Sequence, residues 1–205
     1  MKKLIAFHGD ATLKEAILAE IALHRQADQI IKGTYGRERD GKWKGCAVGC
    51  SIHSLNLSRG LSFETDDHAA YEEGFGIPRQ MAYLEDLIFE RLPDGKHVEW
   101  PERFMNAIQP GANLEMVAPR FVHWLLVDAL KLVKPEWADV REVLEQYADL
   151  YQRWIDGVKP SAKDFNRVAA RAARAALADL AARVCDQADK LIELMSECTP
   201  VSLEV

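Results

Sequence analysis

Hydrophobic residues recur every three to four positions along most of this chain, which is the period of an α-helix. No stretch shows sustained period-two alternation with β-branched enrichment, and the one weak strand candidate is Leu4–Phe7. The pattern therefore predicts an all-α, single-domain bundle of about seven to nine helices over residues 1–202. The expected helical segments are roughly residues 12–32, 46–55, 66–76, 79–92, 102–108, 120–133, 136–157 and 161–198.

Capping signals define the first and last of these helices. Thr12 is followed three residues later by Glu15, which is the spacing of a capping box. Gly33 suits the position just past a helix C-terminus. Ser161 and Asp164 have the same N-terminal capping spacing. The first helix is therefore expected to begin at Thr12 and to continue to Gly33.

Composition adds limits on partners. The chain has 205 residues, enough for one sizeable core, and its net charge of −6 gives no basic footprint for duplex nucleic acid. We therefore do not expect nucleic acid as a partner, although a local basic patch is compatible with this charge. No segment reaches the roughly 18 apolar residues that span a bilayer, so no membrane partner is expected.

The residues at the two ends of the chain bear on targeting and processing. The apolar run near the N-terminus stops at His8, too soon for a signal peptide, so we expect a cytoplasmic protein with reduced cysteines. If the chain is phage-encoded, that cytoplasm is the host's. Residues 203–205 resemble the remnant of a cleavable expression tag and are left out of the fold prediction.

The first expected helix carries two polar residues on its apolar stripe. His24 and Asp28 are one turn apart, so Asp28 could orient the imidazole, and Lys32 follows one turn later. Alternatively, the stripe simply meets solvent near its end, or His24 is a core histidine with a satisfied hydrogen bond. The stripe consists of Leu13, Ile17, Ile21, His24, Asp28 and Ile31.

The segment KGCAVGCSIH, residues 44–53, gathers soft metal ligands. On a helix, Cys46 and Cys50 share a face and His53 lies one turn beyond, so the three could supply zinc ligands. His68 could be a fourth ligand. However, the chain lacks the CxxC pairs that structural zinc sites usually use. We therefore assign no metal to this segment.

A cysteine nucleophile is a second interpretation of the same segment. A thiol just after Gly45, at a helix N-terminus, should have a lowered pKa, and the free backbone N–H groups could bind an anion. Lys42 and Lys44 add positive charge, and His24 or His53 could act as base. The catalytic residues of this hypothesis are Cys46, Cys50, His24 and Asp28.

Tight packing is the third interpretation. Buried cysteines often act as small hydrophobic residues. Gly49 inside a helix costs about 1 kcal/mol relative to alanine, so it should serve the close approach of another helix or of a ligand.

Several motifs together resemble a known family. They resemble uncharacterised small helical proteins of phages, prophages and bacterial genomes, over about residues 20–198. The resemblance implies neither a reaction nor a cofactor, but it implies a phage-linked role such as blocking or evading a host defence system. The motifs are IIKGTYG, KGCAVGCSIH, DDHAAYEEGFGIP, YLEDLIFERLP, WPERFMNAIQPGANL and FVHWLL.

Two functions from different classes follow. The first is a helical binding protein of an anti-defence type that captures a small anionic, nucleotide-like ligand or a host protein. Its expected site is the junction of the first helix and the Gly–Cys helix. The second is a cysteine-dependent hydrolase or transferase that uses the same junction. The sequence specifies neither a cofactor nor an oligomeric state. The expected ligand-binding residues are Lys32, Lys44, His53, Tyr35 and Glu85.

Overall fold

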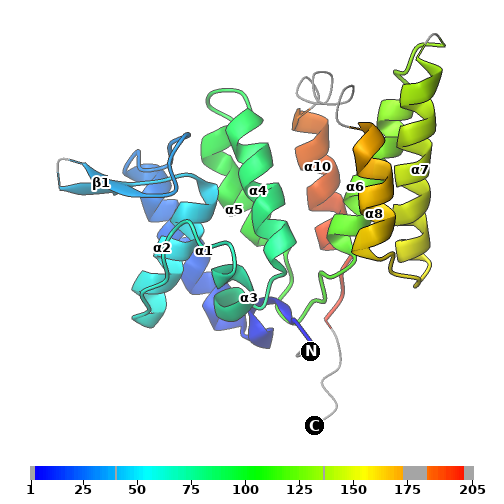
Figure 1. Cartoon of the computed structure of the whole chain (residues 1–205). Helices are drawn as coiled ribbons and strands as arrows, with labels where there is room; N and C mark the ends of the chain where they lie inside the picture. Colours follow the sequence, from blue (N-terminus) through cyan, green and yellow to red (C-terminus); the bar gives the residue numbers. More distant parts are fainter. Residues whose placement is uncertain (1–2, 40, 136, 173–183, 201–205) are drawn as a thin grey trace. The chain divides into compact units, whose positions relative to one another are not determined.

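A computed structural model describes residues 3–39, 41–135, 137–172 and 184–200. Within these ranges the chain forms nine α-helices and one two-stranded hairpin, which confirms the all-α prediction (Figure 1). The chain divides into two compact units, Met1–Glu115 with Ile192–Val205 and Met116–Leu191. Each unit is described by itself, and the single-domain organisation stays a prediction. The expected tag remnant at residues 203–205 lies outside the described ranges.

The described elements are helices, apart from a single hairpin between α1 and α2. None of the described helices has the length and apolar character needed to cross a membrane. The first unit holds η1 (Ala6–Gly9), α1 (Ala11–Gln26), β1 (Arg37–Arg39), β2 (Lys42–Lys44), α2 (Ala47–Arg59), α3 (Ala70–Phe75), α4 (Arg79–Arg91), η2 (His97–Glu99) and α5 (Trp100–Ala107). The second holds α6 (Val117–Leu130), α7 (Ala138–Ile155) and α8 (Ala162–Ala172), and α10 (Val184–Ser196) crosses the boundary.

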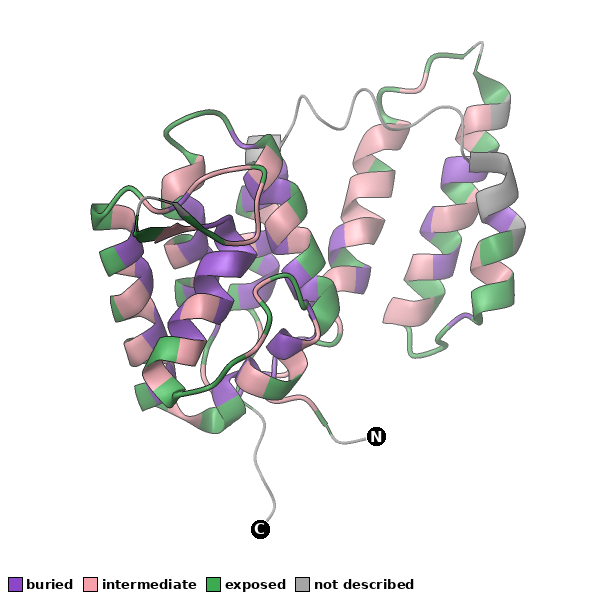
Figure 2. Cartoon of the chain, turned by 60° about the vertical axis from the view of Figure 1, so that its left-hand side comes forward, coloured by how far each residue is buried: buried purple, intermediate pink, exposed green. Residues whose placement is uncertain are grey.

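The core of the first unit forms where α2 packs against α1, α4 and α5. Its largest fully buried side chains include Trp100, Tyr71, Phe75, Phe89 and Phe104. Figure 2 shows buried residues along the inner faces of these helices and exposed residues on their outer faces. Burial of large aromatic side chains is the main stabilising contribution available to a unit of this size.

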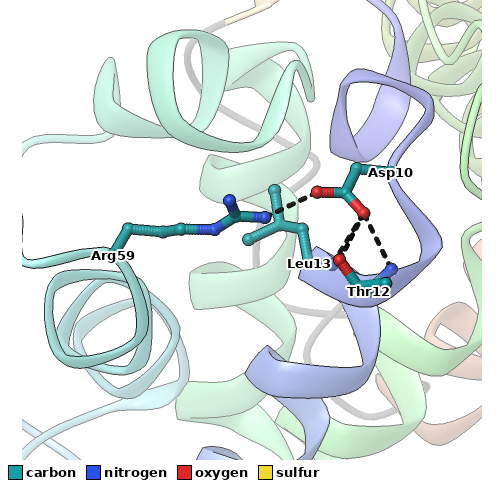
Figure 3. Close-up of polar contacts among 4 residues, drawn as sticks. All are labelled: Asp10, Thr12, Leu13 and Arg59. Carbon is teal, nitrogen blue, oxygen red and sulfur yellow. Dashed lines mark hydrogen bonds and ion pairs between the residues drawn. The ribbon is translucent and has the colours of Figure 1, made fainter.

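Asp10, not Thr12, caps the start of α1 (Figure 3). One carboxylate oxygen of Asp10 accepts hydrogen bonds from the backbone N–H groups of Thr12, at 2.8 Å, and Leu13, at 3.2 Å. The other oxygen accepts from Arg59 at the end of α2, at 2.6 Å. The hydroxyl of Thr12, which also donates to Asp10 at 2.6 Å, and next to it Arg59, hold the pKa of Asp10 well below its usual range. The predicted capping box at Thr12 is therefore wrong by two residues, and α1 is tied to α2 through its cap.

The end of α1 also differs from the prediction. The helix stops at Gln26, and Asp28 has a φ of 53°, in the left-handed region. Beyond it, Ile31 donates a backbone hydrogen bond to Gly45 at 2.8 Å, and Ile30 forms a parallel bridge with Gly45. Tertiary pairing with the segment before α2 therefore replaces the last helical turn that the periodicity predicted.

The weak strand candidate at Leu4–Phe7 is not a strand. Phe7 and His8 have φ values of 51° and 52°, an unusual left-handed pair that costs energy for residues with a side chain. Burial of Phe7 against Phe75, with ring centroids 6.4 Å apart, helps to offset that cost. A backbone hydrogen bond from Ala6 to Ala112 fixes the segment from its other side.

The second unit is built on contacts of α7 with α6 and with α8. Val143, Leu150 and Val168 form its buried cluster. Ser161 and Asp164 form the predicted reciprocal cap, since each side chain bonds the backbone N–H of the other. The predicted long helix from Ser161 also includes residues 173–183, which lie outside the described ranges. Helix α6 is half-buried over most of its length.

Candidate functional site

The β1–β2 hairpin places positive charges opposite one another. Its strands are antiparallel, and Arg37 lies directly opposite Lys44. The same register sets residue 39, an arginine, opposite Lys42. Directly opposed residues have Cβ atoms about 5 Å apart, and like charges at that separation destabilise a hairpin. Within the described ranges, Arg37, Lys42 and Lys44 take part in no ion pair that would relieve this repulsion.

Trp43 attaches the hairpin to the rest of the first unit. Its indole stacks on the imidazole of His53, with centroids 4.1 Å apart and planes only 3° from parallel. The ring of His24 lies 5.2 Å away. Gly36 and Gly45 make room for the indole, because a Cβ on either would approach the ring within 3 Å. The hairpin is therefore seated on two histidines, one from α1 and one from α2.

The two histidines form a hydrogen-bonded chain. Gln29 Oε1 accepts from His24 Nδ1 at 2.7 Å, which leaves His24 Nε2 as an acceptor. His53 Nδ1 then donates to His24 Nε2 at 3.2 Å. Burial, and next to it the neighbouring His24, lowers the pKa of His53. Gln29 therefore orients the His24 ring, a role that the sequence suggested for Asp28. Asp28 lies beyond the end of α1 and so is not on the helical stripe.

The cysteines do not have the environment of a nucleophile. Cys46 caps α2 as expected and accepts a hydrogen bond from Gly49 N–H at 3.5 Å. However, both Cys46 and Cys50 are fully buried. Desolvation raises the pKa of each thiol, and Asp86 and Glu85 nearby raise that of Cys46 further. Burial outweighs the helix terminus, so the predicted lowering of the thiol pKa is wrong.

The N-terminus of α2 is closed by the protein's own backbone. The carbonyl oxygen of Tyr35 lies so close to Gly45 and Gly49 that a Cβ would approach it to 2.7 Å and 1.4 Å, respectively. Gly49 thus serves a close approach, but the approaching group is a loop carbonyl and not the helix or ligand that the sequence suggested. An anion at this helix end would have to displace Tyr35.

Metal binding by the cysteine segment finds no support in the geometry. Within the described residues, no three His, Cys, Asp or Glu side chains lie close enough to hold a metal ion. His68, the suggested fourth ligand, stacks on Tyr83 at a centroid distance of 4.2 Å and makes a T-shaped contact with Tyr35 at a centroid distance of 5.4 Å. It thus has an aromatic environment.

Glu85 lies in the core, away from any external ligand. Its side chain is fully buried, and Tyr71 donates its phenolic hydrogen to Oε2 at 2.5 Å. The other oxygen, Oε1, has no hydrogen-bond partner among the described residues. Desolvation raises the pKa of Glu85 to about 8, so the carboxyl group is mostly neutral at pH 7. The prediction that Glu85 binds ligand does not fit this position.

The remaining predicted ligand residues have structural contacts. Lys32 donates to the carbonyl of Leu92 at 2.5 Å and forms an ion pair with Asp94. Tyr35 donates its hydroxyl hydrogen to Asp86 at 2.9 Å, and its pKa is raised by desolvation and by that carboxylate. Of the predicted set, Lys44 and His53 belong to the hairpin and its seat.

Sequence reasoning missed the hairpin itself and the position of Arg37 opposite Lys44. Its strands are three residues long, RER is charged throughout and KWK has one apolar residue, so the two are too short to show the apolar period-two pattern of a half-buried strand. The available signal was the dipeptide Asp40–Gly41 between RER and KWK, since this pair favours a tight hairpin turn. Gly41 has the expected positive φ of 69°.

Thiol labelling tests the burial of the cysteines. With the native chain at about pH 6, Cys46 and Cys50 are expected to react with iodoacetamide at least about tenfold more slowly than in the denatured chain, because their thiols are buried and protonated. Peptide mapping by mass spectrometry resolves each site. Faster labelling of Cys46 in the native protein would restore the nucleophile hypothesis.

Comparisons with known proteins add no assignment: no family model, no curated protein and no solved structure matches this chain. The resemblance to phage and prophage proteins therefore stays a prediction from the motifs.

Proposed function

We propose that this chain is a binding protein that captures a phosphate-bearing, nucleotide-like anion on the β1–β2 hairpin. The observation that carries the proposal is the cross-strand pairing of Arg37 with Lys44, without an ion pair to either side chain in the described part of the chain. A chain with a net charge of −6 has acidic residues to spare for such a position. A local choice that opposes stability is expected where a ligand supplies the missing partner.

The spacing of the charges suits phosphate. An arginine offers a planar fork that binds phosphate oxygens in pairs, and a lysine adds a compact charge. Arg37 and Lys44 form one rung, and Lys42 begins a second rung two residues along β2. Two residues along a strand span about 7 Å, which is close to the spacing of adjacent phosphates in a short phosphodiester chain. The long side chains can also converge on the more closely spaced phosphates of a nucleotide.

Binding is favoured over cysteine catalysis by the state of the thiols. Both are buried and their pKa values are raised, so neither supplies a thiolate at neutral pH. The motif resemblance adds the prediction that the captured ligand, or a host protein that carries similar charge, belongs to a phage–host conflict.

Native mass spectrometry of protein purified from cells is the first test of this proposal, beside the same sample after denaturation. A mass excess that is lost on denaturation would reveal a captured ligand and its mass. Fluorescence anisotropy with a labelled nucleoside triphosphate and a labelled oligothymidylate then measures affinity directly. Retention of a protein partner in place of either probe would contradict the small-ligand proposal.

Arg37→Glu separates ligand binding from stability. The change creates an opposite-charge pair with Lys44, so the melting temperature should stay equal or rise slightly. Removal of the cationic rung should weaken binding of both probes by at least about tenfold. Arg120→Glu makes the same charge change on an exposed position of α6 and should leave the affinity near that of the unaltered protein. Equal affinities of the two variants would overturn the assignment of the site to the hairpin.

A further inference from the structure

The hairpin packs on the rings of two histidines. Trp43 is its contact with His53, and His53 in turn depends on His24 for its hydrogen bond. The contact between the hairpin and its seat therefore joins one indole and two imidazoles, which come from three different elements. Imidazole is the side chain that changes charge near neutral pH, so this contact is sensitive to acid.

The directions of the two hydrogen bonds determine how each added proton affects the histidine pair. A first proton on Nε2 of His53 leaves the donation from its Nδ1 to His24 intact. A second proton can enter the pair only at His24 Nε2, the atom that accepts this bond. It removes the acceptor and places two cationic rings in contact, with nitrogen atoms 3.2 Å apart. Two like charges at that distance repel strongly inside a protein.

Among the described residues, neither His24 nor His53 forms an ion pair with a carboxylate that would relieve this repulsion. From β2 the pair contacts the neutral indole of Trp43, and from the turn after α1 it contacts the neutral amide of Gln29. His24 is the ionisable group whose charge acts on His53. Lys42 and Lys44 flank Trp43 in β2 and add further positive charge to the same region.

We propose that the His24–His53 pair is a pH-sensitive switch that holds the hairpin in its ligand-binding position at neutral pH and releases it in mild acid. This inference rests on the proposed function, because it assigns regulation to the same anion site. Release follows the second protonation of the pair and is therefore expected only in acid, below the pH at which the first proton binds.

The sign of the effect distinguishes the switch from simple electrostatics. Protonation of two histidines adds positive charge beneath a basic hairpin, and charge alone would strengthen anion binding in acid. The switch predicts the opposite, because release of Trp43 disorganises the cationic rungs. An oligothymidylate probe is used because its phosphodiesters and thymines do not change charge between about pH 7.5 and pH 5, so any change in affinity comes from the protein.

Two measurements between about pH 7.5 and pH 5 test the switch. The indole N–H resonance of Trp43, assigned with Trp43→Phe, is expected to shift while the other four tryptophans and the helical circular dichroism stay constant. The affinity for oligothymidylate is expected to fall about tenfold over the same range. His53→Gln should flatten both responses, and His123→Gln, which removes a histidine of α6, should retain them.

Each alternative outcome is decisive for one claim. A constant Trp43 resonance, or an affinity that rises in acid, overturns the switch while the binding site stands. A Trp43 shift in a protein that binds neither probe at any pH supports release of the hairpin and overturns the proposed function. Loss of helical signal together with the Trp43 shift shows that the histidines control the whole fold, and this also overturns the switch.

Discussion

Replacement of Gly49 by alanine is expected to lower the free energy of unfolding by about 3–5 kcal/mol, or to prevent folding. The new Cβ would lie 1.4 Å from the carbonyl oxygen of Tyr35, far inside van der Waals contact. Neither atom can move easily, because Gly49 lies within α2 and the hydrogen bond from Cys46 N–H to Thr34 O holds the loop at 2.7 Å. Denaturant unfolding followed by circular dichroism gives the measurement.

The sign of the stability change at position 49 distinguishes close packing from helix propensity. Intrinsic helix propensity alone would make the alanine variant about 1 kcal/mol more stable. Gly60→Ala is the matched control, since Gly60 follows the same helix with a φ of 63° and no atom within 4 Å of an added Cβ. Its expected cost is about 1–2 kcal/mol, from the left-handed backbone alone. An alanine at position 49 that leaves the protein as stable as before would contradict the close packing of Tyr35 on α2.

Helical structure was predictable where local signals agree with packing. Helix α4 begins at Arg79 and ends at Arg91, one residue short of the range expected between Pro78 and Pro93. Proline limits the backbone on both sides, so no distant contact is needed to set these ends. The cap at Ser161 and Asp164 is equally local.

Features set by distant contacts were not predictable from periodicity. The apolar stripe of α1 continues through Ile31, yet the chain leaves the helix after Gln26 to pair with Gly45. The apolar stripe did not indicate that this segment would pair with Gly45. As a result, the sequence assigned the orienting role to Asp28, and the structure gives it to Gln29.

In the candidate site, too, local features were predictable and features set by tertiary packing were not. The sequence placed Cys46 correctly at a helix N-terminus and identified His24 and His53 as notable. It could not show that the thiol is fully buried, and burial reverses the expected direction of its pKa shift. Periodicity also gave no reason to set Arg37 opposite Lys44, because register depends on the turn, and only the Asp40–Gly41 pair indicated that turn.

Glu85→Gln is expected to produce a stability difference that grows with pH. The pKa of Glu85 is raised from 4.5 to about 8 in the folded chain, so the folded state binds more protons than the unfolded state between these values. The stability of the unaltered protein therefore falls as pH rises from about 4.5 to 8, by on the order of 3–5 kcal/mol. Glutamine stays neutral and keeps an oxygen that accepts from Tyr71.

The variant and the unaltered protein should thus have similar free energies of unfolding near pH 4.5, and the variant should be several kcal/mol more stable near pH 8.5. His53 acts in the opposite sense, since its lowered pKa removes stability as pH falls below about 6.5. Subtraction of the two denaturation curves cancels that contribution because both proteins retain His53. Glu73→Gln, on the exposed face of α3, should show a difference that does not grow with pH. A constant difference for Glu85→Gln as well would mean that Glu85 is ionised in the fold and that its site is open to water.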